Sequence, residues 1–315
     1  EHWPDSLPAA AGCATALIGI TVLLGWWLDI AWLKSVYPNL ISMKFNTALG
    51  FVLLGSAVAL VHPPRRSRLP GVLVPLAASA VIALATVSVA QDLFRADFGV
   101  DQLLHADDPA PARTVYPGRP AVMTSVNFLL LGIALLIFHR RKSIAQVLVV
   151  AAMTSALFSI AGYTYGLEAL QGLAFLTPLA IHTAAAFVIA GVGLLAAHPD
   201  TGLVGILRQD TLGAFLARRL LPAALVFPVL LGWLVLQGER AGYDGPHAGY
   251  ALQATAQATI LVLFLAYCAA SLNRLDTERS HANDCLRRLE ESEARRQAAE
   301  ESFRKSEQRF RRAFA

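Results

Sequence analysis

Ionisable side chains recur at one set of predicted helix ends, and such groups near membrane depth tend to mark ligand, ion or proton sites. Asp29, Asp92 and Glu168 follow the first, third and fifth apolar segments of the chain. His182 lies at the start of the sixth segment. We predict that these groups line a site together with an amide and four aromatic side chains: Asn46, Trp26, Trp27, Tyr163 and Tyr165. Anchoring of the same residues at the membrane interface is the plainer alternative.

Three histidines occupy equivalent places in a repeated helix motif, because each follows a glycine of that motif by seven residues: His62, His139 and His198. Neutral imidazole is a common ligand of transition metals and haem iron. Three equivalent helix ends could therefore hold a metal ion or a haem. Histidine also suits a membrane interface beside basic loops, and we favour this alternative. The sequence therefore assigns no cofactor.

The elements that would position these groups are membrane helices. With 56% hydrophobic and 15% charged residues, the 315-residue chain cannot give a water-soluble globule a charged surface. A span needs roughly 20 apolar residues, and eight segments approach this length: 9–28, 44–61, 70–90, 121–138, 144–163, 178–197, 220–236 and 249–271. The net charge of +4 lies mainly in short loops and in the C-terminal tail, which indicates contact with a lipid surface and not with nucleic acid.

Basic residues cluster in alternate loops, which predicts the orientation of the chain. Lys and Arg are enriched in the cytoplasmic loops of membrane proteins. Three such clusters follow the second, fourth and sixth spans: Arg65, Arg66, Arg68, Arg140, Arg141, Lys142, Arg208, Arg218 and Arg219. We therefore predict a multi-pass protein of the bacterial inner membrane with both termini in the cytoplasm. The longest opposite loop, around Asp97–Arg119, would form an irregular cap on the periplasmic side.

A threefold internal repeat relates the even-numbered spans. The motif T-x3-F-x-[LI]-x-G begins at Thr47, at Thr124 and at Thr183. Its phenylalanine and glycine lie four residues apart and therefore share one face of a helix. Glycine lets helices approach closely in lipid, so we predict helix contacts at the three motif glycines: Gly55, Gly132 and Gly191. Gly12 lies outside the motif and is expected to matter less.

The tail after the last span has a coiled-coil pattern over residues 272–305. Leu275, Ala282 and Leu289 fall on a seven-residue grid. We predict a homodimer through this helix, and a single solvated helix held by charge pairs is the alternative. The predicted fold class is therefore all-α: a polytopic membrane bundle of about eight spans, with three repeated helix hairpins plus two helices, followed by a cytoplasmic coiled-coil helix.

The last residues resemble the start of a PAS domain. Segment 306–314, SEQRFRRAF, is similar to the S-E-x-R-F-R-x-x-F opening that follows signalling helices in bacterial sensor histidine kinases and diguanylate cyclases. The membrane part also resembles the multipass input regions of such proteins, in the stretches 42–51, 117–120, 218–222, 232–233 and 238–242. This resemblance implies a membrane input domain over 1–271, a signalling helix over 272–305 and a truncated PAS domain over 306–315.

The function that these features predict is the relay of a periplasmic or intramembrane signal to an output domain. The chain has no kinase histidine box, ATP-binding glycines or GGDEF sequence, so catalysis would belong to a missing C-terminal part. A transporter or channel with an oligomerising tail is the first alternative, but the span centres are almost free of the ionisable residues that mark transport. A haem-bearing or metal-binding redox protein is the second. The signal ligand is not specified by the sequence.

Overall fold

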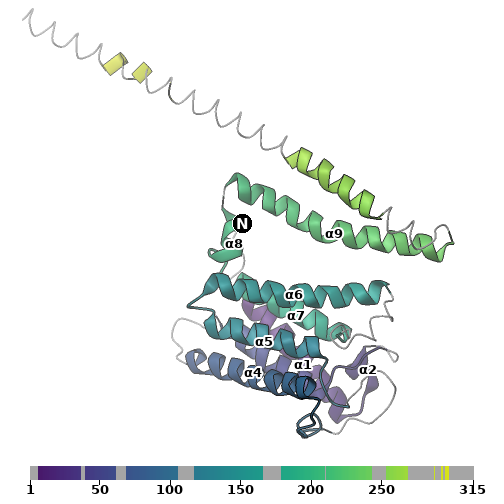
Figure 1. Ribbon diagram of the computed structural model, residues 1–315. Coiled ribbons are helices and arrows are strands. Elements are labelled where there is room, and N and C mark those ends of the chain that lie inside the picture. The colour runs from purple at the N-terminus through teal and green to yellow at the C-terminus, as the bar shows by residue number, and fades with distance from the viewer. Residues whose placement is uncertain are drawn as a thin grey trace, which may run out of the picture. The chain divides into compact units, whose positions relative to one another are not determined.

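The computed structural model describes residues 6–36, 40–61, 69–105, 117–165, 179–209, 211–242 and 253–268, together with 287, 292–293 and 295–297. Among these residues the regular elements are helices and no strand occurs, which confirms the all-α class. The labelled helices are α1 (Leu7–Trp27), α2 (Ala31–Ser35), α3 (Phe45–Ala59), α4 (Pro70–Phe94), α5 (Val122–Ile137), α6 (Lys142–Tyr165), α7 (Ile181–Ala196), α8 (Gly202–Arg208) and α9 (Leu212–Arg240) (Figure 1). The chain divides into two compact units, Glu1–Arg218 and Arg219–Ala315.

Four helices in the described part of the chain are long and apolar enough to cross a membrane: α1, α4, Lys142–Tyr163 within α6 and Gly213–Gly238 within α9. A helix rises 1.5 Å per residue, so these lengths suit roughly 30 Å of hydrocarbon. Four further apolar helices are shorter: α3, α5, α7 and Gln253–Cys268. Several apolar helices of spanning length agree with the predicted membrane protein. The sequence did not predict the short helices α2 and α8, which lie in the connections.

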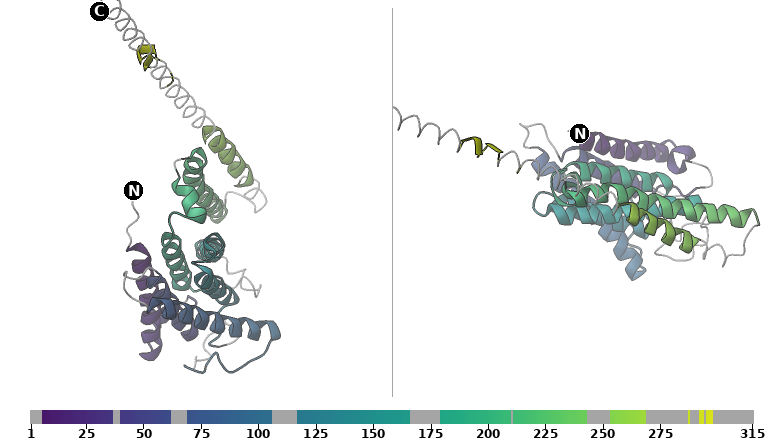
Figure 2. Two further views of the ribbon diagram at one scale, coloured as in Figure 1. Left: turned by 90° about the vertical axis from the view of Figure 1, so that its left-hand side faces the viewer. Right: turned by 90° about the horizontal axis from the view of Figure 1, so that it is seen from above.

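Six helices of the first unit form three hairpins arranged in a ring (Figures 1 and 2). Helix α1 pairs with α3, α4 with α5, and α6 with α7. The first helix of each hairpin also packs on a neighbouring hairpin, so that α1 contacts α7, α4 contacts α3 and α6 contacts α5. The second helices α3, α5 and α7 contact one another. The hairpins are thus related by a pseudo-threefold arrangement that matches the threefold sequence motif.

The motif phenylalanines meet where the three second helices join. The ring centroids lie 4.9 Å apart for Phe51 and Phe128, 4.7 Å for Phe51 and Phe187, and 5.0 Å for Phe128 and Phe187. All three side chains are buried. Tilted and edge-to-face aromatic pairs at this spacing attract each other beyond simple contact. Such packing matters in lipid, where the hydrophobic effect does not drive helices together.

The first hairpin closes through a glycine on each of its helices. A Cβ atom added at Gly55 would lie 2.4 Å from the backbone nitrogen of Ala16 on α1. A Cβ atom added at Gly12 would lie 2.2 Å from the backbone nitrogen of Ala59 on α3. Backbone atoms of a packed helix cannot move aside as a side chain can. The expectation that Gly12 matters less is therefore wrong, because α1 and α3 approach each other through both glycines.

In the other two hairpins the motif glycine faces a side chain. A Cβ atom added at Gly132 would lie 2.6 Å from Cγ1 of Ile82 on α4. A Cβ atom added at Gly191 would lie 2.4 Å from Cγ of Met153 on α6. Both contacts are tight, but methionine is flexible and can adapt, whereas Ile82 is β-branched and stiff in a helix. We therefore expect the third hairpin to tolerate change at the motif glycine better than the first.

The three second helices start in the same way, after a residue with extended backbone. These residues are Lys44 (ψ 154°), Ala121 (ψ 145°) and Ala180 (ψ 142°). The chain that leads into α3 and α7 is buried, as Met43 and Leu179 show. Non-helical backbone is tolerated at membrane depth where protein covers it. This covering explains how helices of 15 and 16 residues can lie inside a membrane bundle.

The predicted signalling helix and PAS segment lie almost wholly outside the described residues. Of 272–305 the structure describes 287, 292–293 and 295–297, which are helical, and of 306–315 it describes none. The coiled coil therefore stays a prediction.

In the second unit, Arg219 Nη1 donates a hydrogen bond of 2.9 Å to the Tyr267 hydroxyl.

Candidate functional site

A buried arginine organises the cap, which we define as residues 95–105 and 117–120 of the loop between α4 and α5. Arg119 Nε donates to Oδ2 of Asp101 at 2.8 Å. Its Nη1 donates to Oδ1 of Asp92, near the end of α4, at 3.2 Å. One guanidinium group thus ties both parts of the cap to α4.

The burial of these charges makes their pairing necessary. The side chain of Arg119 is 4% exposed and that of Asp101 is 8% exposed. A charge buried this deeply is strongly unfavourable unless it is paired and hydrogen-bonded, and Arg119 Nη2 adds a third bond of 3.0 Å to the carbonyl oxygen of Ala96. Burial alone would lower the pKa of Arg119, but the carboxylates of Asp101 and Asp92 outweigh it and raise that pKa above its ordinary value. The guanidinium therefore stays charged.

Two amide side chains extend this network to α3 and α4. Gln91 of α4 is fully buried, and its Nε2 donates to Oδ1 of Asp101 at 2.9 Å. Its Oε1 accepts a bond of 2.9 Å from the backbone N–H of Phe98. Asn46, at the start of α3, donates through Nδ2 to the carbonyl oxygens of Val100 and Asp101 at 3.2 and 3.3 Å. The cap therefore joins the first hairpin to the second.

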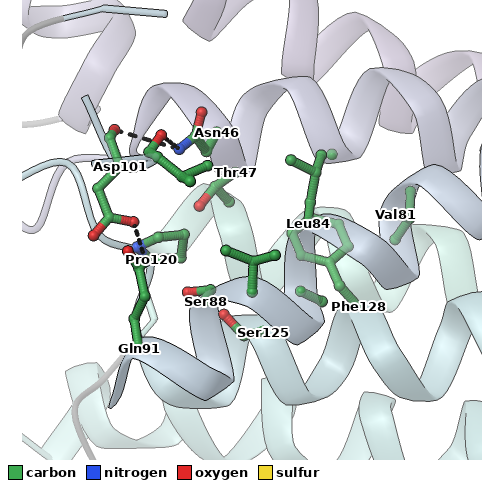
Figure 3. Close-up of a pocket in the computed structure, with 14 residues that line it drawn as sticks. Asn46, Thr47, Val81, Leu84, Ser88, Gln91, Asp101, Pro120, Ser125 and Phe128 are labelled. Atoms are coloured by element: carbon green, nitrogen blue, oxygen red, sulfur yellow. Dashed lines mark hydrogen bonds between the residues drawn. The ribbon is translucent and has the colours of Figure 1, made fainter. Parts of the chain in front are cut away.

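A pocket lies next to the cap, lined by residues of α3, α4 and α5 (Figure 3). Its free space, including the open mouth, is about 410 Å³. Asn46, Gln91 and Asp101 line its polar end. Most of the remaining lining is apolar and includes Val81, Leu84, Ala85, Val87 and Phe128.

Two buried serine hydroxyls line the same pocket. Ser88 of α4 is 5% exposed and Ser125 of α5 is 1% exposed. Neither Oγ makes a hydrogen bond within the described part of the chain. A buried hydroxyl without a partner costs roughly 1–3 kcal/mol. A molecule bound in the pocket would supply the missing partner.

Of the predicted site residues, Asn46 and Asp92 belong to the Arg119 network, whereas Trp26 and Asp29 belong to a neighbouring set of contacts. Trp26 Nε1 donates to the carbonyl oxygen of Met43 at 2.9 Å. The imidazole of His105 in the cap lies edge-on to Trp26, with ring centroids 5.2 Å apart. Asp29 is exposed and pairs with Lys34, whose hydrogen bond lowers the pKa of the Asp29 carboxyl. Neither Trp26 nor Asp29 lines the pocket.

His182, Tyr163 and Trp27 also lie outside the pocket lining. His182 is the second residue of α7, and its two ring nitrogens are buried without a hydrogen bond in the described part. Tyr163 and Tyr165 lie in the last turn of α6. Trp27 is 83% exposed at the end of α1, as a lipid-facing or interfacial anchor would be. Glu168 lies outside the described residues.

Two of the three equivalent histidines lie close together at the far end of α5 and α7. The ring centroids of His139 and His198 are 5.8 Å apart, and Phe138 stacks on His198 at 4.5 Å. His62 lies outside the described residues. Within the described ranges, no group of three or more His, Cys, Asp or Glu side chains could hold a metal ion. Metal or haem binding by these histidines, which the sequence did not favour, therefore stays an untested alternative.

Arg119 and Asp101 are site residues that the sequence patterns did not indicate. A signal was present for Arg119, which stands in the stretch Pro-Gly-Arg-Pro at 117–120, whose prolines restrict the backbone. The loop offers several carboxylates, however, and sequence alone could not select Asp101 among them. Ser88 and Ser125 gave no signal, because serine is common in membrane helices.

Comparisons of the chain with protein-family models, with curated proteins and with solved structures yield no match. The sequence motifs and the geometry of the capped pocket are therefore the features that bear on function.

Proposed function

We propose that this chain is the membrane-embedded signal-input part of a bacterial signal-transduction protein, with the capped pocket as its input site. On this proposal eight helices cross the inner membrane and both termini are cytoplasmic. The tail pairs with a second copy as a coiled coil and continues into a PAS domain and a kinase or cyclase output. The support is the alternation of basic loops, the eight apolar helices and the PAS-like last residues.

The observation that carries the proposal is that one ion-pair network lies at the polar end of a pocket between two hairpins. Arg119 bonds to Asp92 and Asp101 accepts a bond from Gln91, which holds the cap on α4, and Asn46 holds the cap on α3. A molecule that enters or leaves the pocket changes what this network packs against. A ligand shifts an equilibrium between two conformations only by its different affinity for them, and packed helix interfaces respond by discrete shifts. A change at the interface of two hairpins is therefore available as a signal.

Transport is the competing function, and the position of the charges argues against it. Transporters place charged residues and broken helices near the bilayer midplane. Here the paired charges lie at the end of α4 and in the cap. The most apolar stretches of the four candidate spans each contain at most two charged residues.

The test is the output of the complete protein, which on this proposal continues into its output domain. Arg119→Gln removes the charge that holds the cap, so we expect it to change basal autophosphorylation or cyclic-dinucleotide synthesis by about tenfold, as typical coupling free energies allow. Arg208→Gln is the matched control, since Arg208 pairs with Asp200 at 2.9 Å on the surface. Asn46→Ala, which deletes only neutral hydrogen bonds, should act in the same direction as Arg119→Gln. Equal output from all these variants and the wild type would refute the proposal.

A further inference from the structure

The pocket offers hydrogen bonds but no free charge, which defines the kind of molecule that fits it. Both oxygens of the Asp101 carboxylate already accept bonds, Oδ2 from Arg119 and Oδ1 from Gln91. All three guanidinium nitrogens of Arg119 are likewise engaged. The charges at the polar end of the pocket are therefore already paired with each other.

The three paired charges of Arg119, Asp92 and Asp101 also disfavour anions. Arg119 contributes one positive charge, and Asp92 and Asp101 contribute two negative charges, which leaves a net charge of −1. A carboxylate or phosphate would be repelled and would lose its hydration on entering the apolar part of the pocket. A cation would meet no carboxylate that lacks a partner among the residues lining the pocket.

We infer that the pocket binds a small uncharged amphiphile, with an alcohol or carbonyl oxygen bonded to Ser88 and Ser125 and an apolar body against the remaining lining. The two hydroxyls come from adjacent helices and both line the pocket (Figure 3). Each is buried and makes no hydrogen bond with the residues that the structure describes. A hydroxyl can both donate and accept a hydrogen bond, so Ser88 and Ser125 can bond to an alcohol oxygen or to a carbonyl oxygen.

The apolar part of the lining supports the same ligand class. Leu84, Val87 and Phe128 line the pocket with hydrocarbon. A short aliphatic chain with one polar end matches this lining. That such a molecule acts as a signal rests on the proposed function. Its binding to the pocket can be measured without any output from the protein.

The experiment is photolabelling of the protein in lipid nanodiscs with a short aliphatic alcohol that carries a diazirine, followed by mapping of the labelled residues by mass spectrometry. We expect label on the pocket lining of α4 and α5. Unlabelled hexanol should compete, whereas hexanoate and hexylammonium of the same chain length should not. Replacing both Ser88 and Ser125 by Ala should weaken competition by hexanol at least about fivefold, the effect of losing roughly one hydrogen bond.

The matched control is Ser56→Ala, because Ser56 is an exposed serine on α3 and should leave labelling unchanged. Ala85→Leu fills the pocket and should abolish the label. If the larger side chain prevents folding, the variant with both Ser88 and Ser125 replaced by Ala tests the inference instead. Label spread evenly over lipid-facing residues, or equal competition by hexanoate, would overturn the inference. Specific label without any effect of hexanol on output would overturn the proposed function alone. Absence of label together with an altered output in Arg119→Gln would overturn the ligand class alone.

Discussion

The rings of Phe51 and Phe187 lie 4.7 Å apart although they belong to the first and the third hairpin. Phe128 of the second hairpin contacts both rings. The repeated motif therefore places the same residue type at one common point from three separate stretches of chain. Because interiors are close-packed, a change at any of these rings acts on all three hairpins.

The phenylalanine cluster should be essential for stability. We expect Phe187→Ala to lower the free energy of unfolding by roughly 3 kcal/mol, because it leaves a cavity between three helices. Phe158→Ala on α6 is the control, since that side chain is 51% exposed. The measurement is unfolding in mixed detergent micelles, followed by circular dichroism. Equal midpoints for both variants would show that the cluster has no special role in packing.

The loss of folded protein on replacing a glycine by alanine should depend on which atoms lie opposite that glycine. Gly12→Ala and Gly55→Ala push a methyl group into backbone and should greatly reduce the folded yield in detergent. Gly191→Ala should be milder, because its methyl group meets the flexible side chain of Met153. Gly162→Ala is the control, as nothing lies within 4 Å of its added Cβ. A folded yield of Gly12→Ala that equals that of Gly162→Ala would contradict the close approach of α1 and α3.

The orientation in the membrane can be tested with reporter fusions. The basic loops predict cytoplasmic signals from fusions after His62 and after Ala315, and a periplasmic signal from a fusion after Ala106. Alkaline phosphatase and green fluorescent protein report the two sides in opposite ways. A periplasmic signal after Ala315 would overturn the proposed count of eight spans.

The framework of the bundle was predictable because it depends on local patterns. Apolar runs marked the helices, and the recurring Thr, Phe and Gly marked the three hairpins. The site was only partly predictable, because it depends on which side chains a loop brings together. Asn46 and Asp92 were identified from their places at helix ends, but Arg119, which bonds to Asp92, lies 27 residues away from it along the chain. Gly12 was misjudged because a single glycine outside the motif gives no sign of its partner on another helix.

The proposed signalling helix should transmit a rotation or a change of pairing. Each residue turns a helix by about 100°, so an insertion changes the phase of everything beyond it. Seven added residues after Arg279 restore the coiled-coil seam, whereas four displace it by about half a heptad. We expect the seven-residue insertion to keep regulated output and the four-residue insertion to lock output on or off. Regulation that survives both insertions would show a flexible tether.

The central claim, that the cap is the input element, is tested most directly by locking the cap to α3. Asn46 Nδ2 donates a hydrogen bond of 3.2 Å to the backbone carbonyl oxygen of Val100, so cysteines at both positions lie within reach of a short, reducible bifunctional thiol reagent after Cys13, Cys268 and Cys285 are replaced by serine. The measurement is the output of the complete protein in nanodiscs with the cross-link formed and after its reduction, with the single Asn46→Cys variant as the control. Our account predicts that the cross-linked protein no longer responds to occupancy of the pocket and that reduction restores the response. An unchanged response at complete cross-linking would contradict the account.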